Sequence, residues 1–272
     1  MAQRIVIASQ KGGVGKTTVA LHLALALAER GRSVLLADLD PQGGIGLSLA
    51  KGDAELPGLA DYLMGQIQAA EAVIPTHLRG LSLLPRGRLD PIDTCELERA
   101  LFEPGVLDKA LAELEAPFDL TLLDTPSGLG MITRGALRAS RFVLLPFQAS
   151  MLSLRSISQA LRVVEHVRSA ENPDLTLLGI LPTMADRTTD SAQEVLVDIW
   201  TGFSGVLDTV IPRAEVFARA SREGVPIGFL GGRPSPEVRR FDTLAAEVEG
   251  LLETLSPREE RHADRPQRKL LG

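Results

Sequence analysis

A glycine-rich stretch near the start of the chain, Lys11–Thr18 (KGGVGKTT), limits the possible folds more than any other feature of the sequence. It follows an apolar run at residues 5–8 and precedes a helical pattern at residues 19–29. A strand, a glycine turn and a helix in this order form a loop that binds phosphate groups. The first turn of the helix adds unpaired N–H donors and the positive end of its dipole. The stretch therefore predicts a nucleotide site.

The residue types in this loop match the chemistry of phosphate binding. Gly12, Gly13 and Gly15 can adopt positive φ angles and let backbone N–H groups approach phosphate oxygens. Lys16 is placed to reach the β- and γ-phosphates, and the hydroxyl of Thr17 to ligate Mg²⁺. An ordinary strand–helix turn is the alternative, but the glycines, the Lys, the Thr and the flanking elements all agree on a nucleotide site.

Lys11 is a second cation, at the outer end of the loop. The general pattern does not require a Lys five positions before Lys16. A side chain at this place cannot easily bend back onto the phosphates of its own loop. It could instead serve a nucleotide held by a facing subunit and cancel charge as the β–γ bond breaks. A solvated surface Lys is the alternative, and position alone does not decide between the two.

Two later apolar runs end in carboxylates, one at Asp38 and Asp40 and the other at Asp124. Open α/β sheets keep their sites at the carboxyl ends of parallel strands. We expect Asp124 to hold a Mg²⁺-bound water beside Thr17. Asp40 is the candidate that orients the attacking water close to the metal, and Asp38 is expected only to brace the loop. A plain turn closed by Pro41 is the alternative for the Asp38–Asp40 pair.

The alternation of apolar runs and helical patterns predicts an α/β fold. We expect a P-loop NTPase with a mostly parallel central sheet and helices on both faces, in a single domain at residues 1–256. A polar, flexible tail follows at residues 257–272. The expected strands lie at residues 5–8, 33–37, near 73, 81–84, 118–124, 141–145, 175–181 and 206–211. The expected helices include residues 19–29, 58–65, 67–72, 93–101, 105–114, 152–167 and 235–255.

The composition and the start of the sequence indicate the cellular compartment of the chain. A single cysteine, Cys95, excludes an internal disulfide, and the four His residues show no zinc spacing. The first expected strand begins almost at once, so we expect no signal peptide. No run of about 20 apolar residues occurs that could span a membrane. These features predict a cytoplasmic protein.

Charge is distributed unevenly along the chain. The net charge is −6, yet residues 213–240 carry six Arg against three Glu, and the tail at 256–272 carries a further net charge of +2. A locally basic C-terminal third on an acidic body fits a confined face that binds polyanions. A solvated surface of mixed charge fits the same counts.

With these residues placed, the sequence resembles the ParA family of the deviant Walker A (ParA/MinD) ATPases. The resemblance runs from about Arg4 to Leu255 and is carried by several motifs. They are KGGVGKTT at 11–18, DLDPQG at 38–43, LADYLMG at 59–65, GLSLLP at 80–85, LLDTP at 122–126, LLPFQASMLSLRSISQAL at 144–161 and VIPRAEVFARASREGVPI at 210–227.

The resemblance implies a catalytic apparatus. It implies that Lys11 acts across an ATP-sandwiched dimer, that Gly12 lies near the partner's nucleotide, and that Asp40 positions the hydrolytic water. The implied reaction is hydrolysis of ATP to ADP and phosphate, with slow intrinsic turnover and with ATP and Mg²⁺ as cofactors. The residues expected to bind nucleotide are Lys11, Gly12, Gly13, Val14, Gly15, Lys16, Thr17, Thr18, Asp124, Pro212 and Arg213; those expected near the metal are Thr17, Asp40 and Asp124.

The resemblance also implies a cellular task. ATP would close a homodimer that binds DNA without sequence preference, and a ParB-like or other adaptor would stimulate hydrolysis to position or segregate a cargo on the nucleoid. Arg213, Arg219 and Arg222 are the first candidates for DNA contacts. Arg219 and Arg222 share one helix face at i,i+3 spacing. Alternatively, Arg219 pairs with Glu215 and Glu223, and the patch merely solvates the helix.

Three other members of the wider family fit less well. A MinD-like membrane ATPase needs a C-terminal amphipathic helix, but residues 261–272 offer only Leu270 and Leu271 as an apolar face. A relative of the nitrogenase iron protein needs two cysteines, and a tyrosine-kinase relative needs a tyrosine cluster where this chain has only Tyr62. We therefore expect no membrane partner. The sequence leaves open whether the cargo is a chromosome, a plasmid, a chemoreceptor array or a microcompartment.

The chain departs from the family pattern at three places. Residues 44–46 read Gly-Ile-Gly where polar residues are common, and Arg134-Gly135 stands where an Asn-containing stretch is usual. Ser127 stands where a second Pro is usual, in a turn at residues 125–128 whose N–H groups could sense the γ-phosphate. These departures concern the loops that switch with nucleotide state.

Overall fold

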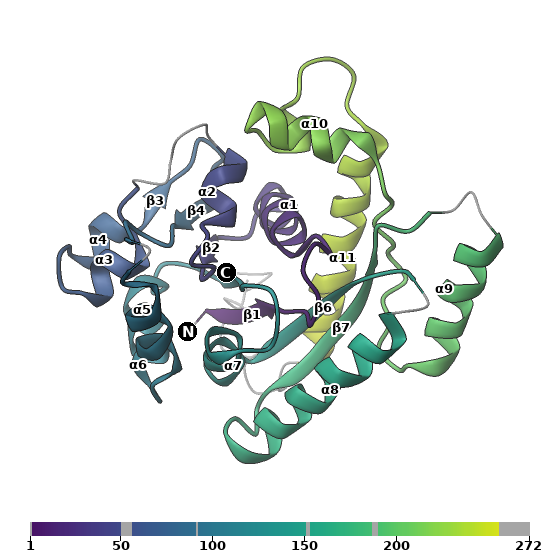
Figure 1. The fold of residues 1–272 in the computed structure, drawn as a ribbon. Coiled ribbons are helices and arrows are strands. Elements are labelled where there is room, and N and C mark those ends of the chain that lie inside the picture. Colours follow the sequence, from purple (N-terminus) through teal and green to yellow (C-terminus); the bar gives the residue numbers. More distant parts are fainter. Residues whose placement is uncertain (1, 50–55, 91, 151–152, 187–189, 256–272) are drawn as a thin grey trace, which may run out of the picture.

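The computed structural model describes residues 2–49, 56–90, 92–150, 153–186 and 190–255. Seven strands form one sheet in the order β3-β4-β2-β5-β1-β6-β7 (Figure 1). All neighbouring strands are parallel except β3 and β4, which are antiparallel. The strands are β1 Gln3–Ile7, β2 Val34–Asp38, β3 Ile74–Pro75, β4 Leu81–Leu84, β5 Leu120–Asp124, β6 Phe142–Gln148 and β7 Thr176–Thr183.

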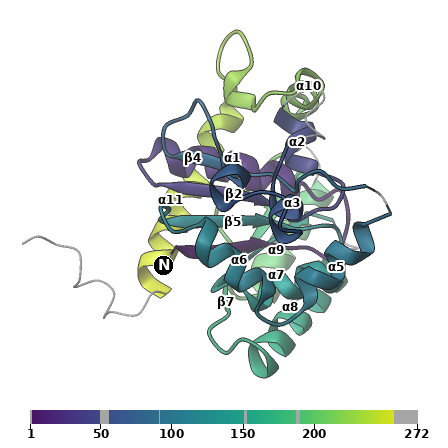
Figure 2. The same cartoon turned by 90° about the vertical axis from the view of Figure 1, so that its left-hand side faces the viewer.

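Helices cover both faces of this sheet (Figures 1 and 2). The helices are α1 Lys16–Glu29, α2 Gly44–Leu49, α3 Leu59–Leu63, α4 Ala69–Ala72, α5 Thr94–Phe102, α6 Val106–Leu114, α7 Met131–Arg138, α8 Ser153–Ala170, α9 Asp190–Gly202, α10 Glu215–Glu223, the 3₁₀ helix η2 Ile227–Phe229 and α11 Pro236–Leu255. In the described ranges, none of these helices is both long and apolar enough to cross a bilayer.

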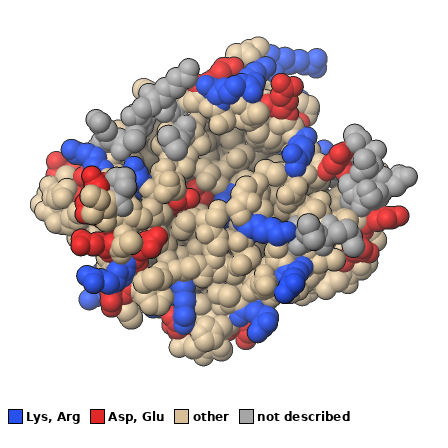
Figure 3. Space-filling model, viewed as in Figure 1, with Lys and Arg blue, Asp and Glu red and all other residues tan. Residues whose placement is uncertain are grey.

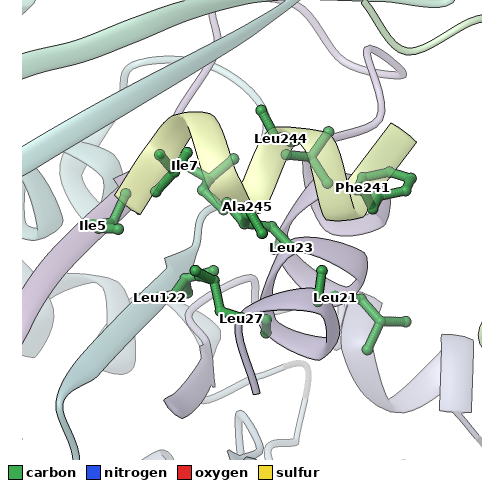
Figure 4. Close-up of a cluster of buried hydrophobic side chains, with 14 of the residues drawn as sticks. Ile5, Ile7, Leu21, Leu23, Leu27, Leu122, Phe241, Leu244 and Ala245 are labelled. Carbon is green, nitrogen blue, oxygen red and sulfur yellow. The ribbon is translucent and has the colours of Figure 1, made fainter. Parts of the chain in front are cut away.

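The core has two halves because alternate strand residues point to opposite faces of the sheet. Ile5 and Ile7 of β1 pack with Leu122 of β5 against α1 and α11, as Figure 4 shows. Val6 of β1 and Leu123 of β5 instead join the cluster that includes α5 to α8. Burial on both faces accounts for the continuous apolar runs of the central strands.

The expected α/β fold is confirmed, but the strand expected at residues 206–211 is wrong. That segment makes only isolated bridges, which pair Ile180 with Val206 and Ala185 with Pro212. The N–H groups of Leu207 and Ile211 donate to the carbonyl oxygens of Ile180 and Pro182 in β7, as in a strand, but those of Asp208 and Thr209 turn to α11. The Glu247 carboxylate accepts hydrogen bonds from the next two N–H groups after Leu207, at 2.8 and 3.1 Å. A long-range contact with α11 thus replaces part of a strand ladder.

The expected tail at residues 257–272 lies outside the described residues, as does residue 256. Helices α2 and α7 were not expected from the sequence. Glycines at the start of these segments and within them hide their helical pattern, since Gly is a poor helix former. The other expected elements occur, and their ends differ by a few residues from those expected.

Gly135 and Gly250 both lie inside helices, but their surroundings differ. A Cβ atom on Gly135 would lie 2.2 Å from the carbonyl oxygen of Leu101, whereas a Cβ atom on Gly250 would have nothing within 4 Å. Ala is favoured over Gly in a helix by about 1 kcal/mol, and overpacking costs about 1–3 kcal/mol. We expect Gly135→Ala to lower the free energy of unfolding in urea and Gly250→Ala to raise it. Changes of the same sign would contradict this packing of α7 against α5.

Candidate nucleotide site

The carboxyl ends of three neighbouring strands meet at one edge of the sheet. β5 lies between β2 and β1, and its last residue, Asp124, is in register with Asp38 of β2 and Ile7 of β1. The glycine loop follows β1 and leads into α1, which begins at Lys16. Residues that are far apart in sequence therefore lie together where open α/β sheets keep their sites.

The loop is anchored at its inner end and open at its outer end. The φ angle is 71° at Gly13 and 88° at Gly15, in the left-handed region that favours glycine. Gly15 caps α1 from this conformation, and Val14 is buried. Gly12 and Gly13 are exposed, and Lys11 is half-buried. The backbone at residues 12 and 13 is therefore accessible to a bound group from outside.

Lys16 is buried at the centre of the site. Its Nζ donates to Ser9 Oγ at 3.3 Å and to Ser127 Oγ at 3.4 Å. Burial lowers the pKa of Lys16, and the nearby charges of Asp124 and Asp40 oppose this shift. A buried ammonium whose hydrogen-bond partners are two neutral hydroxyls at long range is suited to receive an anion.

The two carboxylates at the end of β2 differ in burial and in hydrogen bonding. Asp38 is buried, and its oxygens accept hydrogen bonds from the N–H groups of Asp40 at 3.0 Å and Ile45 at 2.9 Å. Burial raises the pKa of Asp38 to about 7. Asp38 thus braces the loop and the start of α2, as expected. Asp40 is half-buried and lies near enough to Lys16 to influence it, and its Oδ1 accepts a hydrogen bond from the N–H group of Gln42.

Asp124 is the most deeply buried ionisable group of the site. Neither of its carboxylate oxygens has a hydrogen-bond partner within the described part of the chain. Burial, followed by the charge of Asp38, raises the pKa of Asp124 to about 8, and the nearby Thr17 and Lys16 oppose this rise. Two orphaned carboxylate oxygens beside a threonine hydroxyl fit a hard divalent cation such as Mg²⁺.

The protein side chains alone do not form a complete cage for such a cation. Within the described ranges, no group of three or more His, Cys, Asp or Glu side chains could hold a metal. Mg²⁺ usually keeps several waters and takes one or two carboxylates together with substrate phosphates. The arrangement of Thr17 and Asp124 beside a phosphate loop fits that mode of binding.

An apolar pocket of about 390 Å³ lies beside the loop, between it, the end of β7 and α10. Its size suits a small organic group such as a nucleoside. The pocket brings together five residues that the sequence analysis assigned to nucleotide binding and that come from distant parts of the chain. They are Val14, Gly15, Thr18, Pro212 and Arg213.

His22 supports one wall of this pocket and was not expected from the sequence. Its Nδ1–H donates to the carbonyl oxygen of Thr18 at 2.7 Å, and its Nε2 accepts from the N–H group of Ile227 at 3.1 Å. The ring stacks on Phe241 and meets the edge of Phe217, which lines the pocket. Burial lowers the pKa of His22 to about 4, so the ring is neutral. A single His in an apolar helix gives no signal by which this role could have been found.

The structure separates the three candidate DNA-binding arginines. Arg213 is exposed at the pocket, whereas Arg219 and Arg222 lie on the exposed side of α10. Figure 3 shows basic and acidic side chains together over the top of the molecule, where α10 lies. Arg219 lies 3.7 Å from Glu223, and the two side chains are about half exposed. Such a long, solvated ion pair contributes little.

Comparisons with known proteins agree with this site. A family model described as an AAA domain matches residues 2–177. The chromosome partitioning protein ParA of Caulobacter vibrioides is 36% identical over 228 residues, which cover 82% of this chain and 85% of that protein. The chromosome-partitioning ATPase Soj of Thermus thermophilus is 39% identical over 251 residues, which cover 90% of this chain and 95% of that protein.

A solved structure is similar over a comparable length. It is that of cobyrinic acid a,c-diamide synthase from Mycobacterium smegmatis with a bound ATP analog and magnesium, and its TM-score is 0.75. It is 35% identical in sequence, and the match covers 90% of this chain and 93% of that one. Near-complete coverage by relatives at this identity, together with the loop and strand-end carboxylates, shows that the chain belongs to the ParA/MinD family of deviant Walker A ATPases.

Proposed function

We propose that the chain is a ParA-type ATPase that binds ATP with Mg²⁺ at this site and hydrolyses it slowly. The observation that carries the proposal is the meeting of Lys16, Asp124 and the glycine loop beside an apolar pocket. The solved relative from Mycobacterium smegmatis holds an ATP analog and magnesium. The whole apparatus is assigned to one domain at residues 1–256.

Each part of the site has a task in this proposal. The backbone N–H groups of the loop and Lys16 bind the phosphates, and the pocket that contains Pro212 and Arg213 holds the nucleoside. Thr17 would ligate Mg²⁺ and Asp124 would hold a Mg²⁺-bound water, and the ion would supply positive charge to offset the charge that develops on the phosphates. Asp40 orients the attacking water close to the metal.

Lys11 acts on the nucleotide of a second subunit in an ATP-dependent homodimer. The exposed backbone at residues 12 and 13 supports this assignment, because it leaves the outer end of the loop open to a facing subunit. A cation supplied from across an interface stabilises the charge of the transition state in other phosphoryl-transfer enzymes. The site would then be complete only in the dimer.

The closed dimer binds DNA without sequence preference through Arg213, Arg219 and Arg222. A twofold axis duplicates the patch, so the dimer gains affinity that one subunit lacks. An adaptor of the ParB type stimulates hydrolysis and releases the dimer from DNA, which positions or segregates a cargo on the nucleoid of a bacterial cytoplasm. The names of the Caulobacter and Thermus relatives support a partitioning role.

The ATPase proposal predicts different defects for two substitutions. Lys16→Ala removes the cation nearest the phosphates and is expected to abolish ATP binding and dimerisation. Asp40→Ala is expected to bind ATP but to lower kcat by about 100-fold or more, since a group that handles the water proton is worth about that much, and to accumulate dimer. Calorimetric titration, phosphate release and light scattering check these results. Asp198→Ala, at an exposed carboxylate of α9, is the control. Unaltered hydrolysis by Asp40→Ala would contradict its assigned role.

The Mg²⁺ assignment predicts a pH-dependent effect of Asp124→Asn in the nucleotide-free protein. The folded-state pKa of Asp124, about 8, lies above the ordinary value of 3.8. The folded chain therefore binds more protons than the unfolded chain between these values, and stability falls as pH rises through this window.

We expect Asp124→Asn to raise the free energy of unfolding at pH 8, on the order of 2 kcal/mol or more, and to raise it less at pH 5, near the lower edge of this window. The variant should also lose the stabilisation that Mg²⁺ and ATP confer on the parent. Urea unfolding at both pH values measures the effect, and Asp198→Asn serves as the exposed control. An identical pH dependence in parent and variant would show that the Asp124 charge is compensated in solution.

The DNA-binding proposal predicts that the double variant Arg219→Glu/Arg222→Glu weakens the binding of duplex DNA at least tenfold. Charge reversal removes two phosphate contacts per subunit, and each contact makes affinity more sensitive to salt. The measurement is a gel shift with the ATP-loaded Asp40→Ala dimer on DNAs of unrelated sequence. Arg79→Glu/Arg99→Glu makes the same change in net charge at exposed arginines elsewhere. Equal binding by the parent and the α10 variant would exclude this patch.

A further inference from the structure

Ser127 is a polar side chain of the site to which the roles above assign no task. It follows β5 in the turn that begins after Asp124, and it is exposed. Its Oγ accepts a hydrogen bond from Lys16 Nζ at 3.4 Å. A Cβ atom built on Gly12 would lie 3.2 Å from the same oxygen. The Ser127 hydroxyl therefore lies against both the phosphate-binding lysine and the backbone of the glycine loop.

Hydrogen bonds on both sides of Ser127 fix its backbone to the site. The hydroxyl of Thr125 donates to the carbonyl oxygen of Ile7 at 2.8 Å. The N–H group of Gly128 donates to the carbonyl oxygen of Ser9 at 3.1 Å. The hydroxyl of Thr133 donates to the carbonyl oxygen of Gly128 at 3.0 Å. The turn is thus tied to β1 and α7. Rotation about χ1 of Ser127 is the freedom that remains.

The two serines that contact Lys16 differ in whether the hydroxyl proton already forms a hydrogen bond. Ser9 Oγ donates to the carbonyl oxygen of Lys11 at 2.8 Å, so its proton is already engaged. Ser127 donates no hydrogen bond to any residue in the described part of the chain. Its proton is available to an acceptor that enters between Lys16 and Gly12.

The contact between Lys16 and Ser127 is weak enough to be exchanged. Charge-assisted N–H···O bonds are about 2.7–2.9 Å long, and this one is longer at 3.4 Å. A phosphate oxygen is a stronger acceptor for an ammonium than a neutral hydroxyl is. Lys16 would therefore turn toward the phosphates on binding and release the Ser127 oxygen, whose proton then faces the same anion.

We propose that Ser127 distinguishes ATP from ADP. Its hydroxyl accepts from Lys16 in the nucleotide-free chain and donates to an oxygen of the terminal phosphate when ATP is bound. This inference rests on the ATPase function proposed above. ADP lacks the acceptor, so the Ser127 contact favours ATP alone and ties the turn that precedes α7 to the state of the nucleotide.

The test compares the affinity of each variant for a non-hydrolysable ATP analogue and for ADP, both with Mg²⁺, by calorimetric titration. Ser127→Ala removes the hydroxyl and leaves the backbone bonds of the turn in place. We expect it to weaken the binding of the analogue about tenfold, the usual size of a hydrogen bond to a charged group, and to leave ADP affinity unchanged. Ser127→Thr keeps a hydroxyl and is expected to retain the parent's ratio of the two affinities.

Thr133→Val is the matched control, because it removes a hydroxyl that braces the same turn without contacting Lys16. Two results would assign Ser127 a packing role and overturn the proposal. One is a similar fall in the ratio of ATP-analogue affinity to ADP affinity in this control. The other is an equal fall in the affinities for both nucleotides in Ser127→Ala. An unchanged ratio in Ser127→Ala would overturn it as well. A parent protein that binds neither nucleotide would overturn the proposed ATPase function, and this inference with it.

Discussion

The buried carboxyl group of Asp124 at the end of β5 is the constraint on which the site depends. Its oxygens have no hydrogen-bond partner in the described residues, and a buried carboxylate in that position is costly. The order of the strands determines what surrounds it: β1 brings the glycine loop and Lys16 from one side, and β2 brings Asp38 from the other. Because Asp38 also raises the pKa of Asp124, Lys16 alone does not stabilise the charged form of Asp124. A bound cation would stabilise that form, at strand ends that the sheet already holds in place.

The apolar pocket beside the loop depends on a different interaction, the packing of His22 between helices. This ring links three elements to the P-loop helix through Phe217 of α10, Ile227 of η2 and Phe241 of α11. Thr18 and Phe217, which line the pocket, both contact His22. The glycine loop and the carboxylates therefore rest on strand ends, whereas the apolar pocket rests on helices that follow β7. The two halves meet at Thr18, one turn before His22 on α1.

The parts of the site with local sequence signals could be predicted, and the parts made by long-range contacts could not. The glycine loop, Asp40 and Asp124 follow short apolar runs, so their place at the sheet edge could be inferred. Residues 206–211 have the apolar character of a strand, but the bonds of their N–H groups to Glu247 depend on where α11 packs. The same holds for His22, whose partners lie about 200 residues away in sequence. Pro212 and Arg213, which line the apolar pocket, could be assigned to nucleotide binding only through the family resemblance.

The structure gives a steric reason for one departure from the family pattern. A Cβ atom on Gly44 would lie 3.0 Å from the Oγ1 of Thr17, closer than most side chains tolerate. Asp38 holds this segment in place through the N–H group of Ile45. The start of α2 is therefore pressed against the hydroxyl assigned to Mg²⁺, and a larger residue at position 44 would push either Thr17 or α2 away. Glycine at this position lets the segment held by Asp38 and the Thr17 hydroxyl of α1 occupy adjacent space, so that a shift of α2 would displace the group proposed to ligate Mg²⁺.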